Sequence, residues 1–246
     1  MGIKGRIHGK LLGEDVVPLS KHNATMSAQK RFGGFKPETE KSVRDAQVKD
    51  DEVQIAFRKL WNAWKAPDGM GDDGEYYSLI RKSSFLKTID YTAADVDKFC
   101  VMLPSLPTNN DRYRFSSKAG LFLSALISRC KDKEFTLTTS GLDFPLHKIG
   151  FRNRKKITVL GDAGDYVGEE MNGGTIIVQG SCGSYAGRMM YCGIIRITRN
   201  AGMNTGAVMD DGEIHIGGKC GGIGDVIFGG AIFEKGELIH EGERDD

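Results

Sequence analysis

Glycine recurs every 19 residues in the second half of the chain, and this repeat limits the possible folds more than any other feature. The repeating positions fall in two columns, one with Gly164, Gly183, Gly202 and Gly221, the other with Gly168, Gly187 and Gly206. Of the 33 glycines in the chain, 19 lie in residues 161–230, whereas residues 75–119 hold none. A fixed period of this length is typical of solenoid proteins, in which each repeat is one structural unit.

A short run of β-forming residues follows in each period, which predicts one strand per repeat. The runs are 175–178, 194–197, 213–216 and 232–234, and residues 157–159 occupy the corresponding place one period earlier. The simplest explanation is a parallel β-helix, in which each period is one coil and equivalent residues stack about 4.8 Å apart. One coil cannot bury its own core, so several must stack, and both ends of the stack need caps.

Stacking sorts the residues of the coils into columns with a shared chemistry. Two inward apolar columns are expected, Ile176, Ile195, Ile214 and Phe233, and, two residues further on, Val178, Ile197 and Ile216. A third apolar column contains Met171, Met190, Met209 and Phe228. The column expected to face outward contains Ile177, Arg196, His215 and Glu234. The repeated glycines are expected where a coil turns sharply, or where a Cβ would collide with the next coil.

The first half of the chain predicts a different architecture, so the predicted fold class is α+β with several domains. Residues 1–48 hold nine Lys or Arg against five Asp or Glu and show no sustained periodicity, so we expect an extended basic N-terminal arm. Residues 49–134 are expected to form a helical domain and residues 135–240 the parallel β-helix. Residues 241–246 form an acidic tail.

Apolar residues at helical spacing define the predicted helices of residues 49–134. The first apolar stripe consists of Val53, Phe57, Leu60, Trp61 and Trp64. A second helix is expected from Glu75 to Leu86. Thr92 and Asp95 resemble a capping box at the start of a third. Ser116 or Ser117 is the expected N-terminal cap of the next helix, and the aromatic residues are interpreted as a helical core.

Composition and charge exclude several classes of protein. With 34 Lys and Arg against 33 Asp and Glu, the formal charge of +1 does not mark a bulk polyanion binder. No apolar run approaches the roughly 20 residues of a membrane-spanning helix, and the N-terminus lacks the apolar core of a signal peptide. The five cysteines are odd in number and lack a C-x-x-C pair, which argues for a reducing, cytoplasmic location.

Several sharper interpretations of the repeat region fail on spacing. Residues 217–224 are rich in glycine but lack the G-x-x-x-x-G-K-[ST] order of a phosphate loop. Cys182 and Cys220 share a column two coils apart, roughly 9–10 Å, which is too far for one zinc ion. We interpret them as small apolar residues. His215 could be an acid–base group, but a solvated charge ladder is the simpler interpretation. No catalytic motif and no cofactor or metal site is predicted.

A cluster of basic residues just before the repeat is the candidate binding site. It consists of Lys148, Arg152, Arg154, Lys155 and Lys156, with no acid between residues 147 and 156. Such a cluster can contact phosphate groups or nucleic acid. The alternative is a solvated face of the first coil, paired with the acidic C-terminal residues, which hold six acids and two bases from Glu234 to Asp246.

The stretch from Gly161 to Val178, with its D-Y-V-G-x-x-M-x-G-G-x-I-x-V core, resembles the GXGXG domain. That domain is the C-terminal β-helix of the large subunit of glutamate synthase, and a related domain forms one of the subunits of formylmethanofuran dehydrogenase. The resemblance covers roughly residues 150–235 and implies a right-handed parallel β-helix. It also implies a mostly structural role, because the catalytic groups of those enzymes belong to other domains or subunits.

Three functions follow from these observations. The first is a non-catalytic scaffold whose β-helix mediates assembly with itself or with a larger complex, in which case its partners are other protein subunits. The second, implied by the resemblance, is an accessory subunit of a glutamate synthase-like or formylmethanofuran dehydrogenase-like oxidoreductase complex. The third is a nucleic-acid- or ribosome-associated factor that uses the basic arm and the basic residues within 147–156. A structural protein of a virus particle is a further alternative.

Overall fold

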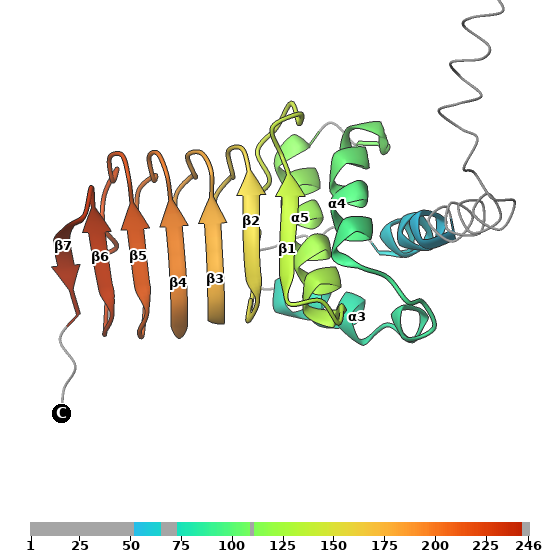
Figure 1. Cartoon of the computed structure of the whole chain (residues 1–246), viewed down its shortest axis with the longest axis horizontal. Helices are drawn as coiled ribbons and strands as arrows, with labels where there is room; N and C mark the ends of the chain where they lie inside the picture. Colours follow the sequence, from blue (N-terminus) through green and yellow to red (C-terminus); the bar gives the residue numbers. More distant parts are fainter. Residues whose placement is uncertain (1–51, 65–72, 109–110, 243–246) are drawn as a thin grey trace, which may run out of the picture. The chain divides into compact units, whose positions relative to one another are not determined.

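A computed structural model describes residues 52–64, 73–108 and 111–242, all within one compact unit that spans Lys49–Asp246. The predicted basic arm (1–48) and most of the acidic tail (241–246) lie outside these residues. The helices come first in the chain, and a parallel β-helix of about five coils follows (Figure 1). The predicted succession of helices and a parallel β-helix is therefore confirmed. No helix in the described ranges is long and apolar enough to cross a membrane.

Among the described residues, four α-helices precede the strands. They are residues 52–63, α3 (Asp73–Lys82), α4 (Ala93–Met102) and α5 (Arg112–Arg129), with 3-10 turns η1 (Phe85–Lys87) and η2 (Leu103–Ser105) between them. The predicted apolar stripe of the first helix is buried from Val53 to Trp61, and Trp64 packs against the core. The capping box is present, because the Asp95 carboxylate accepts the Thr92 backbone N–H at 2.8 Å.

Two predicted helix boundaries are wrong. The second helix ends at Lys82, and residues up to Leu86 belong to the bend and to η1. The fourth helix, α5, begins earlier than expected, since Asp111 is its N-cap and the Asp111 carboxylate accepts the Arg114 backbone N–H at 3.0 Å. Ser116 lies inside the helix and is buried, where its hydroxyl accepts the backbone N–H of His147. A serine hydroxyl can either cap a helix or make a buried hydrogen bond to the backbone, and the local sequence does not distinguish these two roles.

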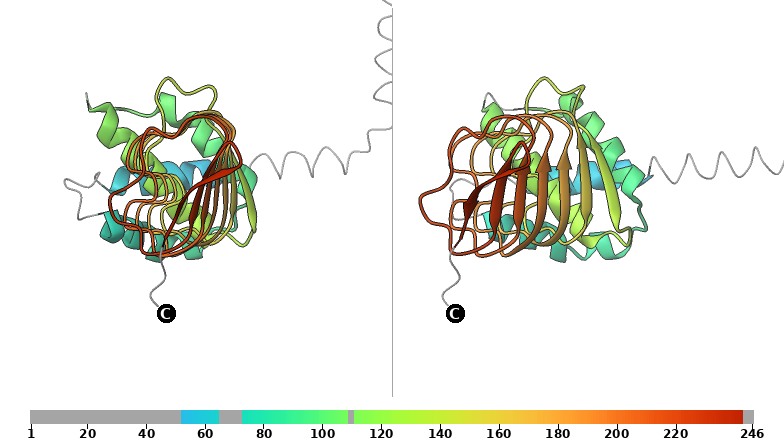
Figure 2. Two further views of the ribbon diagram at one scale, coloured as in Figure 1. Left: turned by 90° about the vertical axis from the view of Figure 1, so that its left-hand side faces the viewer. Right: turned by 60° about the vertical axis from the view of Figure 1, so that its left-hand side comes forward.

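The strands form one sheet in chain order. They are β1 (Glu134–Thr138), β2 (Lys156–Leu160), β3 (Asn172–Val178), β4 (Cys192–Ile197), β5 (Glu213–Ile216), β6 (Ala231–Glu234) and β7 (Glu237–Glu241). Neighbours from β1 to β6 pair in parallel, and β7 closes the end in the antiparallel direction (Figure 1). Viewed along the stack, the coils superpose with their strands on one side (Figure 2).

The coil length is 19 residues only in the middle of the stack. Phe135 pairs with Ile157 and so opens a first coil of 22 residues, while Ile176, Ile195 and Ile214 follow at the predicted spacing. The last coil has 18, because Ile214 pairs with Ile232.

The predicted columns are therefore wrong by one residue at their C-terminal ends. Ile232, not Phe233, continues the inward column and is fully buried. Ile227, not Phe228, pairs with Met209, and Phe228 is 55% exposed. Phe233, not Glu234, follows His215 in the outward column.

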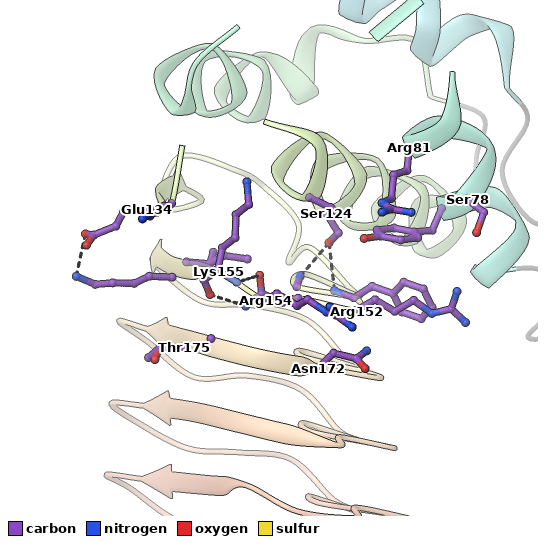
Figure 3. A pocket seen from close by; sticks show the side chains of 18 residues that line it. Ser78, Arg81, Ser124, Glu134, Arg152, Arg154, Lys155, Asn172 and Thr175 are labelled. Atoms are coloured by element: carbon purple, nitrogen blue, oxygen red, sulfur yellow. Dashed lines mark hydrogen bonds and ion pairs between the residues drawn. The ribbon is translucent and has the colours of Figure 1, made fainter. Parts of the chain in front are cut away.

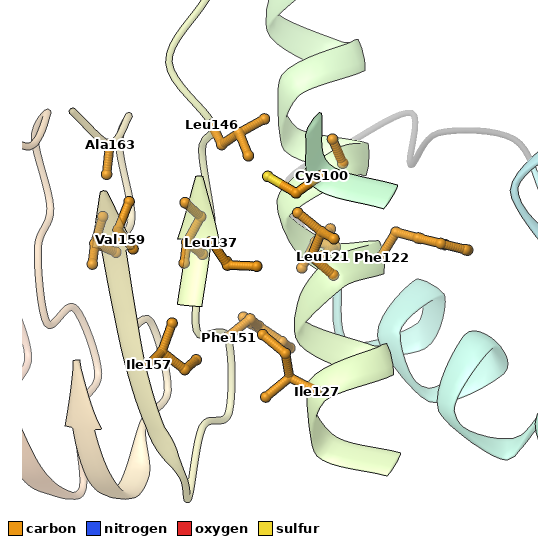
Figure 4. Close-up of a cluster of buried hydrophobic side chains, with 14 of the residues drawn as sticks. Cys100, Leu121, Phe122, Ile127, Leu137, Leu146, Phe151, Ile157, Val159 and Ala163 are labelled. Atoms are coloured by element: carbon orange, nitrogen blue, oxygen red, sulfur yellow. The ribbon is translucent and has the colours of Figure 1, made fainter. Parts of the chain in front are cut away.

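Helices and coils share one hydrophobic core. α5 covers the open end of the first coil, so that Leu121 and Ile127 face Leu137 and Phe151 (Figure 4). Inside the stack, the columns continue with Val159, Val178, Ile197 and Ile216, all at most 2% exposed. The predicted N-terminal cap is thus a helix that buries the apolar end of the solenoid.

The two glycine columns exist for different physical reasons. Gly168, Gly187 and Gly206 adopt φ of 69°, 69° and 71°, the left-handed conformation that glycine tolerates best. In the other column, a Cβ on Gly202 would lie 2.6 Å from the Gly183 carbonyl carbon, because the coils approach closely there.

The coils also contain non-glycine residues in the left-handed conformation, which were not predicted. They flank the left-handed glycine column on either side, in two further columns: Lys148, Tyr166, Tyr185 and Asn204, and Arg152, Glu170, Met189 and Val208.

Candidate functional site

A basic pocket of about 730 Å³ lies where α3 and α5 meet the first coil. Ser78 and Arg81 of α3 line it from one side, and Arg152 and Arg154 of the first coil from another (Figure 3). The start of β3 contributes Asn172, Gly174 and Thr175. We call this cavity the junction pocket.

Positive charge dominates the lining of the junction pocket. Six basic residues line it, Arg81, Lys133, Arg152, Arg154, Lys155 and Lys156, against one acid, Glu134. Hydroxyl and amide groups of Ser78, Ser128, Asn172 and Thr175 supply further hydrogen-bond donors. The aromatic lining residues Tyr77 and Phe151 are 4% and 1% exposed, so they offer no open ring for stacking.

Hydrogen bonds from α5 fix the turn that presents Arg152. The hydroxyl of Ser124, buried on α5, accepts the backbone N–H groups of Gly150 at 2.9 Å and of Phe151 at 3.3 Å. The next residues are held by Asn153, whose side-chain oxygen accepts the Lys155 N–H at 3.0 Å. The basic residues therefore project from a rigid turn.

Three of the bases already have partners. Arg152 Nε lies 2.7 Å from Glu170, and Lys156 Nζ lies 2.9 Å from Glu134. Lys155 Nζ donates to the backbone carbonyls of Cys130 and Asp132, just beyond the C-terminus of α5, where a cation is favourable. Burial lowers the pKa of Lys155 from its ordinary value.

Three other bases remain open to a ligand. Arg81, Lys133 and Arg154 are exposed. Their side chains make no ion pair with any described residue of the chain. Arginine presents a fork of donors that matches carboxylate and phosphate oxygens. Arg81 and Arg154 are thus the groups best placed to bind an anion.

Lys148 was predicted with this cluster, but it does not line the pocket. It is 6% exposed, and its Nζ lies 2.5 Å from Asp73 and 3.1 Å from Glu169. Burial alone would lower the pKa of Lys148, but the hydrogen bond that Lys148 donates to Asp73 and the charge of Glu169 outweigh it and raise that pKa above its ordinary value. Arg188 also contacts Glu169, at 2.5 Å, so this buried network ties α3 to three successive coils.

The partners of the basic cluster lie on α3, on β1 and in the second coil. The acids that pair with it are Asp73, Glu134, Glu169 and Glu170, and none of its ion pairs among the described residues involves the C-terminal acids. The expected pairing with the acidic C-terminal residues is therefore not found in this part of the chain. The sequence pattern did not reveal Arg81 and Lys133, because they lie far from residues 147–156 in the chain and only the fold brings them into the pocket.

His215 sits in a different environment from the predicted charge ladder. Its Nε2 lies 2.7 Å from Glu213, and its ring stacks on Phe233 with centroids 4.6 Å apart and planes within 4°. The one-residue shift of the last coil brings Phe233 there in place of Glu234.

Cys182 is a buried free thiol, whereas Cys192 is exposed. Burial raises the pKa of the Cys182 thiol to about 12, so the thiolate that metals require is disfavoured. Within the described ranges, no three His, Cys, Asp or Glu side chains are grouped closely enough to hold a metal ion.

No family model, curated protein or solved structure matches this chain. The likeness to the GXGXG domain therefore stays a prediction from the sequence. The chemistry of the site follows from the geometry of the junction pocket alone.

Proposed function

We propose that this chain is a non-catalytic assembly protein that holds an anionic group of a partner protein in the junction pocket. The observation that carries this proposal is the lining of six bases against one acid, in which Arg81 and Arg154 remain unpaired among the described residues. An accessory subunit of an oxidoreductase complex, as the sequence resemblance implies, would be one form of this role.

A compact anionic group fits the pocket better than a long polyanion. Further along the same edge of the sheet, a second groove of about 670 Å³ is lined by Asp211, Glu213 and Glu241. A nucleic acid that continued along the coils would meet this negative charge. A single carboxylate or phosphate group on a protein surface would contact only the basic lining of the junction pocket. Nucleic acid is the second candidate, favoured by the density of arginine and lysine at that end.

The free state of all five cysteines supports the expected cytoplasmic location. A reducing compartment keeps such thiols unpaired.

The proposal can be tested by fluorescence anisotropy with two labelled probes, a short glutamate-rich peptide and a single-stranded oligonucleotide of equal charge. We expect the peptide to bind at low salt and to lose at least about tenfold in affinity in the double variant Arg81→Glu, Arg154→Glu. Both side chains are exposed, so the substitutions should leave the fold intact.

The matched control is Arg199→Glu, Lys219→Glu, which changes the net charge equally at exposed positions outside the pocket. We expect less than about twofold change in that control. Equal losses in both double variants, or no peptide binding at low salt, would contradict the proposal. Tighter binding of the oligonucleotide, with loss in the pocket variant, would assign the pocket to nucleic acid instead.

A further inference from the structure

The outer face of the sheet lies on one side of the coils (Figure 2), and α4 flanks it at the β1 end, where the Thr138 hydroxyl donates to Asp97. Alternate residues of each strand point outward, because side chains in a strand alternate between its faces. On β2, β3 and β4 the outward residues include Thr158, Ile177 and Arg196, which are half-buried or exposed, whereas their neighbours in the strands are buried. We call this surface the outer sheet face.

One row of this face carries opposite charges at equal distances from its centre. The register aligns Lys156, Thr175, Ile194 and Glu213 across β2, β3, β4 and β5. Lys156 and Glu213 are both exposed and lie three strands apart, about 14 Å. Thr175 and Ile194, both half-buried, lie between them. The midpoint of the row falls between β3 and β4.

We propose that the outer sheet face binds a second copy of this chain through a two-fold axis that runs parallel to the strands, between β3 and β4. Such an axis places β2 of one copy opposite β5 of the other and keeps the rows in register. Lys156 then faces Glu213 of the second copy, and the same contact forms again on the other side of the axis. Thr175 faces Ile194 at the centre.

The remaining rows contain no like charges opposite one another. In the next row, Ile177 faces Arg196, and Thr158 faces His215. In the third, Gln179 faces Thr198, while Thr138 lies opposite Lys235, beyond the end of β6. If like charges lay opposite one another across the two-fold axis, the two copies would repel each other.

The size of the face sets the strength of the contact. The six strands from β1 to β6, each about 4.8 Å wide, and about five residues along each strand give about 29 Å by 16 Å, or roughly 460 Å² per copy. Two copies together bury about 900 Å², which is below the standard interface of about 1,600 Å² and in the range of transient complexes. Lys156 also has a nearby partner in Glu134, with both side chains exposed, so exchanging that partner costs little. The dimer is therefore weak and sensitive to salt.

This inference extends the proposed assembly role to a second surface, and its failure can be told apart from failure of that role. The junction pocket is tested with Arg81 and Arg154. Of the two residues used to test the dimer, Lys156 also lines the pocket, so the two proposals are separated by Glu213, which does not line it. Glu213→Lys should leave binding of the glutamate-rich peptide unchanged within about twofold.

The experiment is sedimentation equilibrium of the full chain and three variants at low salt. We expect a concentration-dependent dimer for the unchanged chain. Either single substitution, Glu213→Lys or Lys156→Glu, should weaken it at least about tenfold, because two repulsive pairs replace two attractive ones. The double variant Lys156→Glu, Glu213→Lys should recover the dimer, since the exchanged charges again face one another across the axis.

Recovery in the double variant distinguishes this contact from a general effect of net charge. Circular dichroism of each variant checks that the β-helix is intact. An unchanged chain that stays monomeric at the highest accessible concentration would overturn the inference. So would single variants that dimerise as well as the unchanged chain, or a double variant no better than the singles.

Discussion

The middle coils and the first coil differ in what surrounds them. Each middle coil, with Ile176, Ile195 or Ile214 in its inward column, has another coil above and below it. The first coil has a coil on one side and helices on the other, and it is three residues longer than the 19-residue period. Repetition produces a uniform core, whereas the first coil carries the buried charges and the lining of the junction pocket. Function in this molecule is expected where the repeat is interrupted.

The largest expected effect is at the buried charge of the first coil. Lys148→Met removes the cation between Asp73 and Glu169 and leaves a buried carboxylate without its partner. We expect a loss of about 3–5 kcal/mol in the free energy of unfolding. Lys156→Met breaks an exposed pair and should cost at most about 1 kcal/mol. Urea unfolding of both variants gives the comparison, and equal losses would refute it.

The middle coils should respond to lost volume instead. Ile195→Ala removes a fully buried side chain from the inward column. We expect a loss of about 3 kcal/mol, from lost burial and the cavity left behind. Thr198→Ala, at an exposed position just beyond β4, should stay within about 0.5 kcal/mol. Chemical denaturation measures both, and a small effect at Ile195 would mean that the stacked core is loosely packed.

The third prediction uses pH to separate the two regions. Burial lowers the pKa of His147, although the nearby charge of Asp165 opposes this, and its Nδ1 accepts the Asp165 backbone N–H at 2.8 Å. The unfolded chain therefore binds a proton first as the pH falls below about 6.5, and stability is lost from there down to the lowered pKa. In His147→Gln the stability curve should be flatter in this window. Thermal unfolding across pH measures the slope, and an unchanged slope would contradict the assignment.

The smallest effects should have opposite signs at two neighbouring positions. Gly206 and Val208 both have positive φ, 71° and 58°. Gly206→Ala should cost about 1–2 kcal/mol, because alanine is disfavoured in this conformation. Val208→Asn should gain up to about 1 kcal/mol, since asparagine tolerates that conformation better than a β-branched residue. Differential scanning calorimetry resolves both shifts, and a loss at Val208 would show that its side chain contributes more than its backbone costs.

Sequence reasoning was strongest where physical constraints repeat along the chain. The inward column from Ile176 to Ile214 was predicted in its observed register, because each position has an equivalent apolar residue one period away in the sequence. The prediction failed at Phe233, since the last coil drops one residue and no further copy reveals the shift. Ser116 was misassigned for a related reason, because its partner His147 lies far away in the chain.

The candidate site was predictable only in part. Arg152, Arg154, Lys155 and Lys156 were identified from their density in the sequence, and they do line one pocket. Lys148 was grouped with them wrongly. It and Arg152 both adopt the left-handed conformation on either side of Gly150, so their directions do not follow strand alternation. Sequence proximity therefore could not show that one base is buried with Asp73 while the others surround a cavity.

The central claim is that the junction pocket binds an anionic group, and amide chemical-shift mapping tests it most directly. Titration of the isotope-labelled chain with the glutamate-rich peptide at low salt should shift Arg81, residues 152–156 and residues 172–175. The same titration of the Arg81→Glu, Arg154→Glu variant should leave those signals in place. Shifts gathered elsewhere on the molecule, or unchanged shifts in the variant, would contradict the claim.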